Sequence, residues 1–158
     1  MRKKIKVSIV MPNYNSSPHL VQTINSIINQ DFTGWELIII DDNSNTETKR
    51  ILKKFKNKKK IKIYFLKTNK GDGYCRLMGI KKASSNLIAF IDSDDIWKKN
   101  KLEKQINFMK KNNFSFTYTN YETFGKKTKK IYNPPKLNYS NFIKNTSIAT
   151  STMMIKRE

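Results

Sequence analysis

Three stretches of the sequence are almost entirely apolar and lack the polar positions that would alternate along a half-exposed strand. They cover residues 7–11, 37–40 and 87–91, which read VSIVM, LIII and LIAFI. Continuous apolar runs of this length are typical of strands buried on both faces, as in a parallel sheet covered by helices. We therefore expect these stretches to form the inner strands of such a sheet.

Between these runs, apolar residues recur every three or four positions, which is the spacing of one face of an α-helix. The first such pattern follows Ser17 and Pro18, a suitable N-cap and a suitable first helical residue. A second begins near Thr46, a third ends at Ala83 and a fourth follows Asn100. The apolar positions of the first, second and fourth helices are Leu20, Ile24, Ile27 and Ile28; Ile51, Leu52 and Phe55; and Leu102, Ile106 and Met109.

Two weaker strands are expected at residues 61–66 and 114–119, and the alternating pattern of the second places it nearer an edge of the sheet. Strands and helices thus alternate along the chain. This order predicts an α/β fold with a doubly wound, mostly parallel, Rossmann-like sheet. Beyond residue 125 the pattern weakens, and we expect only a short helix at 138–145 and a further strand within 147–158.

The composition fits one globular domain. The chain has 158 residues, of which 37% are hydrophobic and 11% aromatic. No apolar run approaches the roughly 20 residues of a membrane span, and the basic start lacks a signal-peptide pattern, so a cytoplasmic protein is expected. With one cysteine, Cys75, and one histidine, His19, neither an internal disulfide nor a Cys/His zinc site is expected.

The formal net charge of +20 allows another interpretation, a lysine-rich module that binds nucleic acid or an anionic surface. However, 28 of the 32 basic residues are lysine, whereas base recognition and bidentate phosphate contacts favour arginine. We therefore expect no nucleic-acid partner. The lysine runs at 56–60 and 126–130 are either solvated loops or points of peripheral contact with an anionic membrane, at about 1 kcal/mol per basic residue.

The acidic residues are few and clustered. Five of the seven aspartates lie in two groups, Asp41 with Asp42 and Asp92 with Asp94 and Asp95, and each group ends an apolar run. Crowded like charges repel and destabilise a fold unless a cation or hydrogen-bond donors compensate them. Because the carboxyl ends of parallel strands meet at one sheet edge, where ligands bind, both groups should share a cleft with residues 12–15.

The second group has the arrangement of a metal site. Side chains two apart in an extended segment point to the same side, so Asp92 and Asp94 can face one ion. A few carboxylate oxygens suit Mg²⁺ or Mn²⁺, which keep positions open for water and substrate phosphates, and such an ion neutralises the charge on a departing diphosphate. The alternative is an ordinary turn in which Asp94 or Asp95 caps the following helix.

Other motifs for nucleotide or acyl chemistry do not occur in the sequence. The glycines at 71, 73 and 79 lack the G-x-G-x-x-G spacing, and neither a P-loop nor a G-x-S-x-G turn is present. Hydride transfer, P-loop hydrolysis and serine-hydrolase chemistry are therefore disfavoured. Cys75 and His19 have no visible triad partners, and we expect them to pack within a helix and to lie on a helix surface, respectively.

Four blocks in order resemble the family 2 glycosyltransferases over nearly the whole chain: VSIVMPNYN, QDFTGWELIIIDDNSNTET, GYCRLMGIKKASSNLIAFIDSDDIW and TSTMMIKRE. The resemblance implies the A-type nucleotide-diphospho-sugar transferase fold and an inverting transfer from a UDP-sugar to a glycan hydroxyl. It implies Mn²⁺ or Mg²⁺ as cofactor and a glycan or lipid-linked glycan as acceptor. It also implies bacterial surface polysaccharide or lipooligosaccharide synthesis, in the cytoplasm or peripherally at the inner face of the membrane.

The resemblance further implies residue roles in nucleotide binding. It places Pro12, Tyr14 and Asn15 at the nucleotide, with the Tyr14 ring against the uracil. It gives Asp42 the role of accepting the uracil N3 proton. Asp41 is expected to be structural or to lie on the ribose side.

Around the diphosphate, the resemblance puts Arg76 in the family's Ala-Arg-Asn element, which this sequence keeps only in part. Asp92, with Ser93, would contact the ribose or metal-bound water. Asp94 would bind the metal, and Asp95 the metal or the donor sugar.

We expect residues 1–120 to form the donor-binding part and residues 121–158 to begin the acceptor-side part, within one structural domain. The family's catalytic base is usually the aspartate of a Glu-Asp pair in its second half, and the chain ends before such a pair. A donor-binding fragment that transfers sugar weakly is therefore expected.

Overall fold

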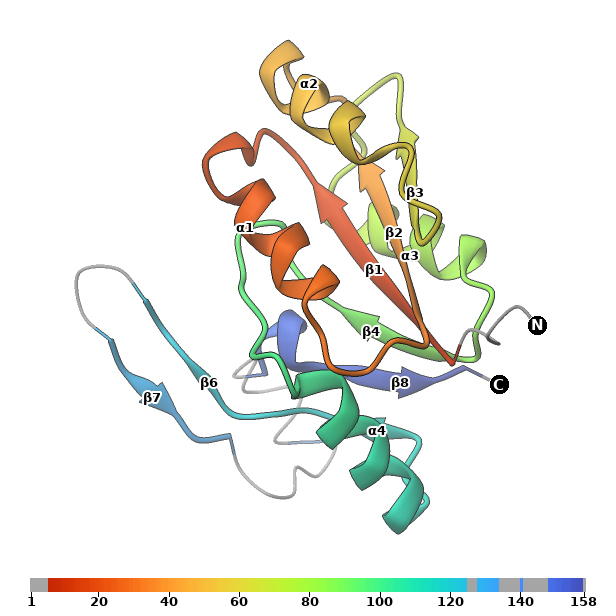
Figure 1. Ribbon diagram of the computed structural model, residues 1–158, viewed down its shortest axis with the longest axis vertical. Coiled ribbons are helices and arrows are strands. Elements are labelled where there is room, and N and C mark those ends of the chain that lie inside the picture. The colour runs from red at the N-terminus through yellow and green to blue at the C-terminus, as the bar shows by residue number, and fades with distance from the viewer. Residues whose placement is uncertain (1–5, 125–127, 134–139, 141–147, 158) are drawn as a thin grey trace.

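A six-stranded sheet in the order β3-β2-β1-β4-β8-β5 forms the centre of the protein (Figure 1). The computed structural model describes residues 6–124, 128–133, 140 and 148–157. The strands of this sheet are β1 (Val7–Asn13), β2 (Trp35–Asp41), β3 (Ile61–Phe65), β4 (Leu87–Phe90), β5 (Phe116–Thr117) and β8 (Met154–Lys156).

The directions of the strands confirm the expected α/β fold with a mostly parallel sheet. Strand β1 pairs in parallel with β2 on one side and with β4 on the other, and β2 pairs in parallel with β3. Strand β8 returns antiparallel between β4 and β5. The strand expected at 114–119 is confirmed as an edge strand, although only β5 within it is paired.

Four helices cover the two faces of the sheet. The apolar residues of α1, α2 and α4 share one core with one face of β1 and β2, whereas α3 packs with the other face. Figure 1 shows α1 and α2 on the side of the sheet opposite to α3. The helices are α1 (Ser17–Ile28), α2 (Thr46–Phe55), α3 (Asp72–Lys82) and α4 (Lys101–Asn112).

Helix α3 approaches β1 closely because residue 79 is a glycine. A Cβ added at Gly79 would lie 2.4 Å from Cγ1 of Val10, which is shorter than any normal carbon contact. The missing side chain therefore sets the distance between α3 and the central strand. This proximity brings the first turns of α3 over the carboxyl ends of the strands.

One part of the fold differs from expectation, and one alternative weighed for the acidic residues is excluded. Strands β6 (Tyr121–Glu122) and β7 (Lys130–Ile131) form a separate hairpin, in a region where the sequence pattern predicts no strand. Neither Asp94 nor Asp95 caps the following helix, because α4 begins at Lys101 after Asn100. The helix expected at 138–145 lies, apart from residue 140, outside the described residues.

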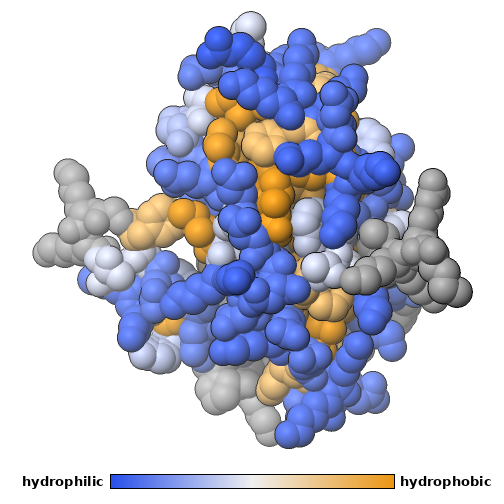
Figure 2. Space-filling model, in the orientation of Figure 1, coloured by the Kyte–Doolittle hydropathy of each residue, from blue (hydrophilic) through white to orange (hydrophobic). Residues whose placement is uncertain are grey.

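Most of the charged residues lie on the surface, as expected from the composition, and the exceptions include Glu36, Asp41 and Asp42. Hydrophilic side chains cover most of the face shown in Figure 2, with smaller apolar areas between them. Within the part of the chain that the structure describes, no helix is long and apolar enough to cross a membrane.

Glu36 joins several elements at the amino-terminal edge of the sheet. It is buried in β2, and its carboxylate accepts hydrogen bonds from the Ser8 hydroxyl at 2.6 Å and from the Ser84 amide at 2.7 Å. Lys62 on β3 lies 2.7 Å from the same carboxylate. Burial alone would raise the pKa of Glu36, but the hydrogen bonds from Lys62, Ser8 and Ser84 outweigh it and lower the pKa from 4.5 to about 2.

We expect Glu36→Gln to lower the free energy of unfolding at pH 7 by about 2 kcal/mol, because glutamine is uncharged and has one acceptor oxygen where glutamate has two. The folded-state pKa is lower than the unfolded one, so the carboxylate stabilises fully above pH 4.5 and progressively less as the pH falls toward 2. The difference in the free energy of unfolding between the wild-type protein and Glu36→Gln should therefore shrink as the pH falls from 4.5 toward 2. Urea unfolding followed by circular dichroism at pH 7, 4.5 and 3 measures it.

The matched control is Glu103→Gln, which removes the same charge at an exposed position on α4. It should change the free energy of unfolding by less than about 0.5 kcal/mol. A Glu36→Gln difference that stays constant between pH 7 and pH 3 would contradict the assigned role of the carboxylate.

Candidate functional site

Both groups of aspartates lie at the carboxyl-terminal edge of the sheet. The parallel register pairs Asn13 at the end of β1 with Asp41 at the end of β2. On the other side of β1, the Ile91 amide donates to the Val10 carbonyl at 3.2 Å, so residues 92–95 leave the sheet at the same edge. We call residues 92–95 the acid loop.

Asp41 organises the loops that follow β1 and β2. Its carboxylate accepts hydrogen bonds from the Asn13 amide nitrogen at 2.7 Å and from the Ser44 backbone amide at 3.2 Å. The Ser44 hydroxyl in turn accepts from the Asn15 amide at 3.0 Å. Because Asp41 is fully buried, these contacts give it a structural role in holding the two loops together.

Asp42 holds a third loop. Its two carboxylate oxygens accept hydrogen bonds from the amides of Lys70 at 2.7 Å and Gly71 at 2.8 Å. Gly71 has a φ of 83°, a conformation that favours glycine, and it is the residue before α3. Asp42 is itself buried, and its carboxylate has four lone pairs, one more than the bonds that it accepts from Lys70, Gly71 and the Cys75 thiol.

The residues after β1 present one aromatic ring to solvent. Pro12 is buried as part of β1, whereas Tyr14 is 51% exposed. Asn15 has a φ of 50°, and its side-chain oxygen accepts from the Asn45 amide at 2.8 Å, which fixes the turn beside the ring. The structure therefore places an accessible ring face near the Asp41 and Asp42 loops.

Helix α3 connects the two acidic groups. The Arg76 guanidinium donates to Asp92 at 2.7 Å and lies 3.6 Å from Asp72. The preceding residue, Cys75, is buried beside Asp42, and burial followed by the Asp42 charge raises the pKa of its thiol to about 12. Cys75 is therefore an unreactive packing residue, as expected, and Arg76 compensates one carboxylate of the acid loop.

Ser151 secures the acid loop from a distant part of the chain. It belongs to the short 3₁₀ helix η1 (Thr150–Thr152), and its hydroxyl accepts from the Asp92 amide at 2.8 Å and donates to Asp95. The Trp97 indole nitrogen donates to the Ser151 carbonyl at 2.9 Å. On the opposite side, Thr23 of α1 donates to the Ser93 carbonyl at 3.0 Å.

The role of Ser151 was missed from the sequence. The block TSTMMIKRE contributes to the family resemblance, but nothing in its pattern links a serine there to aspartates more than fifty residues earlier. The contact depends on the antiparallel return of β8 beside β4, which the apolar pattern alone does not predict.

The three aspartates of the acid loop have different surroundings. Asp92 and Asp95 are part-buried and bonded to Arg76 and Ser151, whereas Asp94 is exposed and has no hydrogen-bond or ion-pair partner among the described residues. Burial raises the pKa of Asp95, against the Ser151 hydrogen bond, and the charges of Asp92 and Asp94 raise it further. A cation at this loop would relieve that repulsion.

The residues present fit a divalent ion that is held partly by the substrate. No three His, Cys, Asp or Glu side chains within the described ranges are placed to hold a metal together. Mg²⁺ and Mn²⁺ need no such cage, because they bind through one or two carboxylates together with waters and substrate phosphates. Asp94 and Asp95 are the residues that would hold such an ion.

Comparisons with known proteins bear on the family and the fold of the chain. The family model described as "Glycosyl transferase family 2" matches residues 8–156. The chain is 37% identical to "Putative teichuronic acid biosynthesis glycosyltransferase TuaG" of Bacillus subtilis, in a match that covers 96% of this chain and 62% of that protein. It is 39% identical to "UDP-Glc:alpha-D-GlcNAc-diphosphoundecaprenol beta-1,3-glucosyltransferase WfgD" of Escherichia coli, with coverages of 96% and 60%.

Among solved structures, the fold is similar to that of Staphylococcus aureus TarS 1-349 in complex with UDP-GlcNAc. The two share 30% sequence identity at a TM-score of 0.72, over 77% of this chain and 36% of TarS. The chain spans about three-fifths of the length of the two curated relatives described above. Since the family model matches nearly every residue and the fold agrees, this chain belongs to glycosyl transferase family 2.

Proposed function

We propose that this chain binds a UDP-sugar as the donor-binding part of an inverting, metal-assisted glycosyltransferase that makes a bacterial surface glycan. The observation that carries the proposal is the acid loop. The carboxylates of Asp92 and Asp95 are hydrogen-bonded to Arg76 and Ser151. The third, Asp94, is exposed and has no partner among the described residues, and it lies at the sheet edge where the Asp41 and Asp42 loops meet. Such a loop suits a metal-bound diphosphate.

The names of the relatives support the substrate classes. WfgD is named as a transferase from UDP-Glc to a lipid-diphosphate-linked sugar, and TarS was solved with UDP-GlcNAc. TuaG is named for teichuronic acid biosynthesis. We extend from these names only the common features, a UDP-sugar donor and a glycan or lipid-linked glycan acceptor.

In this proposal, the loops after β1 and β2 bind the nucleotide. The Tyr14 ring stacks on the uracil, and Asp42 accepts the N3 proton with a lone pair left free by its bonds to Lys70 and Gly71. Asp41 fixes the loops, with Asn15 bordering the ribose side. A buried charged acceptor favours uracil over a base that lacks a proton at N3.

The acid loop holds the diphosphate end of the donor. Asp94 and Asp95 would hold a Mn²⁺ or Mg²⁺ ion, which supplies charge neutralisation for the departing diphosphate when bound. Arg76 holds the Asp92 carboxylate in place, and Ser151 orients Asp95. The acceptor oxygen attacks the anomeric carbon from the face opposite the diphosphate, so the configuration inverts, and its proton passes to a base that we do not assign.

The rival function is a lysine-rich module that binds nucleic acid or anionic surfaces, and it does not explain why three aspartates cluster in the acid loop. A role for the lysine run at 56–60 in peripheral contact with the inner face of the membrane remains compatible with the transferase and is part of the proposal. Binding to a phosphate backbone would weaken steeply with salt, whereas UDP binding should depend chiefly on divalent metal.

UDP binding should depend on Mn²⁺ through Asp94. We expect Asp94→Asn to reduce the affinity for UDP in the presence of Mn²⁺ by about tenfold or more, because an amide is a much weaker ligand than a carboxylate for a hard cation. Without Mn²⁺, the variant and the wild-type chain should bind UDP equally. Isothermal titration calorimetry with and without Mn²⁺ measures both affinities.

Asp31→Asn is the control for this substitution, because Asp31 is an exposed aspartate paired with Lys99 outside the acid loop. It should leave the Mn²⁺ dependence unchanged. If wild-type UDP affinity were the same with and without Mn²⁺, the metal role of Asp94 would be wrong.

Asp42 should determine the preference for uracil. We expect the wild-type chain to bind UDP more tightly than CDP, and Asp42→Asn to lose about 1 to 3 kcal/mol of that preference, because cytosine has no proton at N3. The ratio of the two affinities is measured by calorimetry with Mn²⁺ present. It separates base recognition from any general loosening of the Lys70 and Gly71 loop, which would weaken both nucleotides alike.

Asn43→Asp tests the same ratio at the neighbouring position, where the side chain pairs with Lys49 on the surface. The preference for UDP should persist in that variant. An Asp42→Asn chain that still prefers UDP by the wild-type ratio would remove Asp42 from the base pocket.

A further inference from the structure

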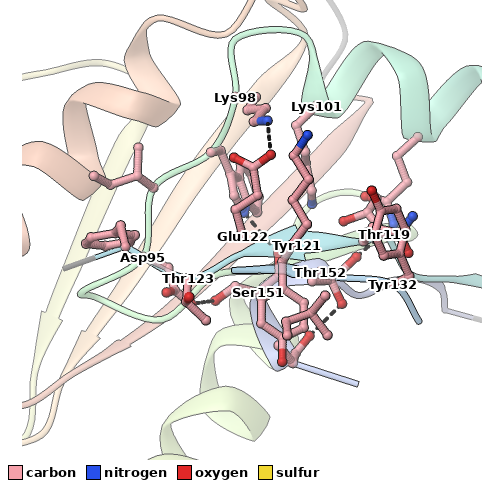
Figure 3. Close-up of a pocket in the computed structure, with 18 of the residues that line it drawn as sticks. Asp95, Lys98, Lys101, Thr119, Tyr121, Glu122, Thr123, Tyr132, Ser151 and Thr152 are labelled. Carbon is pink, nitrogen blue, oxygen red and sulfur yellow. Dashed lines mark hydrogen bonds and ion pairs between the residues drawn. The ribbon is translucent and has the colours of Figure 1, made fainter. Parts of the chain in front are cut away.

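A cavity of about 910 Å³ lies beside the acid loop. Asp95 and Ser151 form part of its wall, together with the start of α4 and the β6–β7 hairpin. In Figure 3, Thr119 and Tyr132 lie on the side opposite to Asp95. The nucleotide contacts proposed above do not use this cavity, so it is available to a second substrate next to the sugar end of the donor.

The wall of the cavity carries more positive than negative charge. Its two carboxylates already have partners, since Glu122 pairs with Lys98 at 3.1 Å and Asp95 accepts from Ser151 (Figure 3). Three further lysines in the wall have no ion-pair partner within the described part of the chain: Lys101, Lys104 and Lys130. The cavity is therefore electrostatically suited to an anion.

Lys101 is the innermost of these cations. Its Nζ is buried and has no hydrogen-bond partner among the described residues, and it lies 3.7 Å from the centroid of the Trp97 ring. The ring compensates only part of the lost hydration of an ammonium group. Burial accordingly lowers the pKa of Lys101 to about 7. An anion in the cavity would supply the missing partner and favour the charged form.

Aromatic rings complete the cavity. Its lining includes Tyr121, Phe124 and Tyr132. The side chain of Phe124 is 56% exposed and that of Tyr132 is 74% exposed. Exposed rings offer apolar faces that can pack against the C–H face of a sugar. A buried cation together with open rings suits a sugar that carries a phosphate, rather than a free anion or a neutral glycan.

We propose that this cavity binds the phosphate or diphosphate attached to the acceptor sugar, with Lys101 pairing with a phosphoryl oxygen. The inference rests on the proposed transferase function and assigns the acceptor's chemical class. Lys104 and Lys130 add charge at the wall, and the rings hold the sugar. Anchoring the phosphate in the cavity positions the acceptor hydroxyl toward the donor at the acid loop, so Lys101 is a substrate-binding residue.

Lys101→Met tests the proposal, because methionine keeps an unbranched apolar side chain beside Trp97 and removes the charge. Binding to the 158-residue chain is measured by calorimetry with four probes: inorganic pyrophosphate and octyl-diphospho-N-acetylglucosamine, both in EDTA, the neutral octyl N-acetylglucosaminide, and UDP with Mn²⁺. We expect the two phosphate probes to bind about tenfold more weakly to the variant, the neutral glycoside to bind weakly to both chains, and UDP affinity to stay within twofold.

Lys99→Met is the matched control, since Lys99 pairs with Asp31 and does not line the cavity, and it should change none of the four affinities. Lys101→Arg should keep most of the phosphate affinity. If the thermal midpoint shows that Lys101→Met does not fold, the double variant Lys104→Met with Lys130→Met is tested instead, because both lysines are exposed. It should bind the two phosphate probes about threefold or more weakly than the wild-type chain.

Four results would overturn the proposal. Unchanged pyrophosphate affinity in the variants would show that the cavity is not an anion site. An equal loss for UDP would assign Lys101 to the donor, and a neutral glycoside that binds as tightly as its diphosphate counterpart would remove the phosphate requirement. A wild-type chain that fails to bind UDP with Mn²⁺ contradicts the transferase function itself, whereas one that binds UDP but neither phosphate probe contradicts this inference alone.

Discussion

Strand β1 is the element on which the remaining structure depends, because it pairs in parallel on both sides and is buried along its whole length. Parallel pairing requires the neighbouring strands to end at the same edge. The register between Asn13 and Asp41 and the bond from Ile91 to Val10 therefore bring two acidic groups, far apart in the sequence, to either side of one strand end. Gly79 lets α3 come close enough to connect them through Cys75 and Arg76.

Hydrogen-bond donors explain why so many carboxylates are tolerated at one edge. Asp41 and Asp42 are removed from water, and backbone amides and the Asn13 side chain replace the hydration that they lose. Asp92 and Asp95 are compensated in the same way by Arg76 and Ser151. Repulsion is thus offset residue by residue, and Asp94 is the one member of the acid loop for which the described residues provide no partner.

The sequence was sufficient to predict the inner strands, the four helices and the edge at which the acids meet, because continuous apolar runs and helical spacing report burial directly. The runs at 37–40 and 87–91 correspond to β2 and β4. The hairpin of β6 and β7 was not predicted, since two paired residues per strand leave no periodicity to detect. Ser151 and Lys101 were also missed, because their significance comes from neighbours that only the tertiary fold supplies. Residue roles in the nucleotide site, and the division at residue 120, remain predictions.

The return of β8 has a consequence for how the chain folds during synthesis. The Ser151 hydroxyl that accepts from the Asp92 amide is separated from it by 59 residues, and β8 fills the place between β4 and β5. While residues 92–147 are being translated, β4 has no neighbour on that side, and its open hydrogen-bonding edge can pair with another chain. The acid loop then acquires its final shape only when the segment around Ser151 has left the ribosome, because until then the Asp92 amide and the Asp95 carboxylate lack this hydrogen-bond partner.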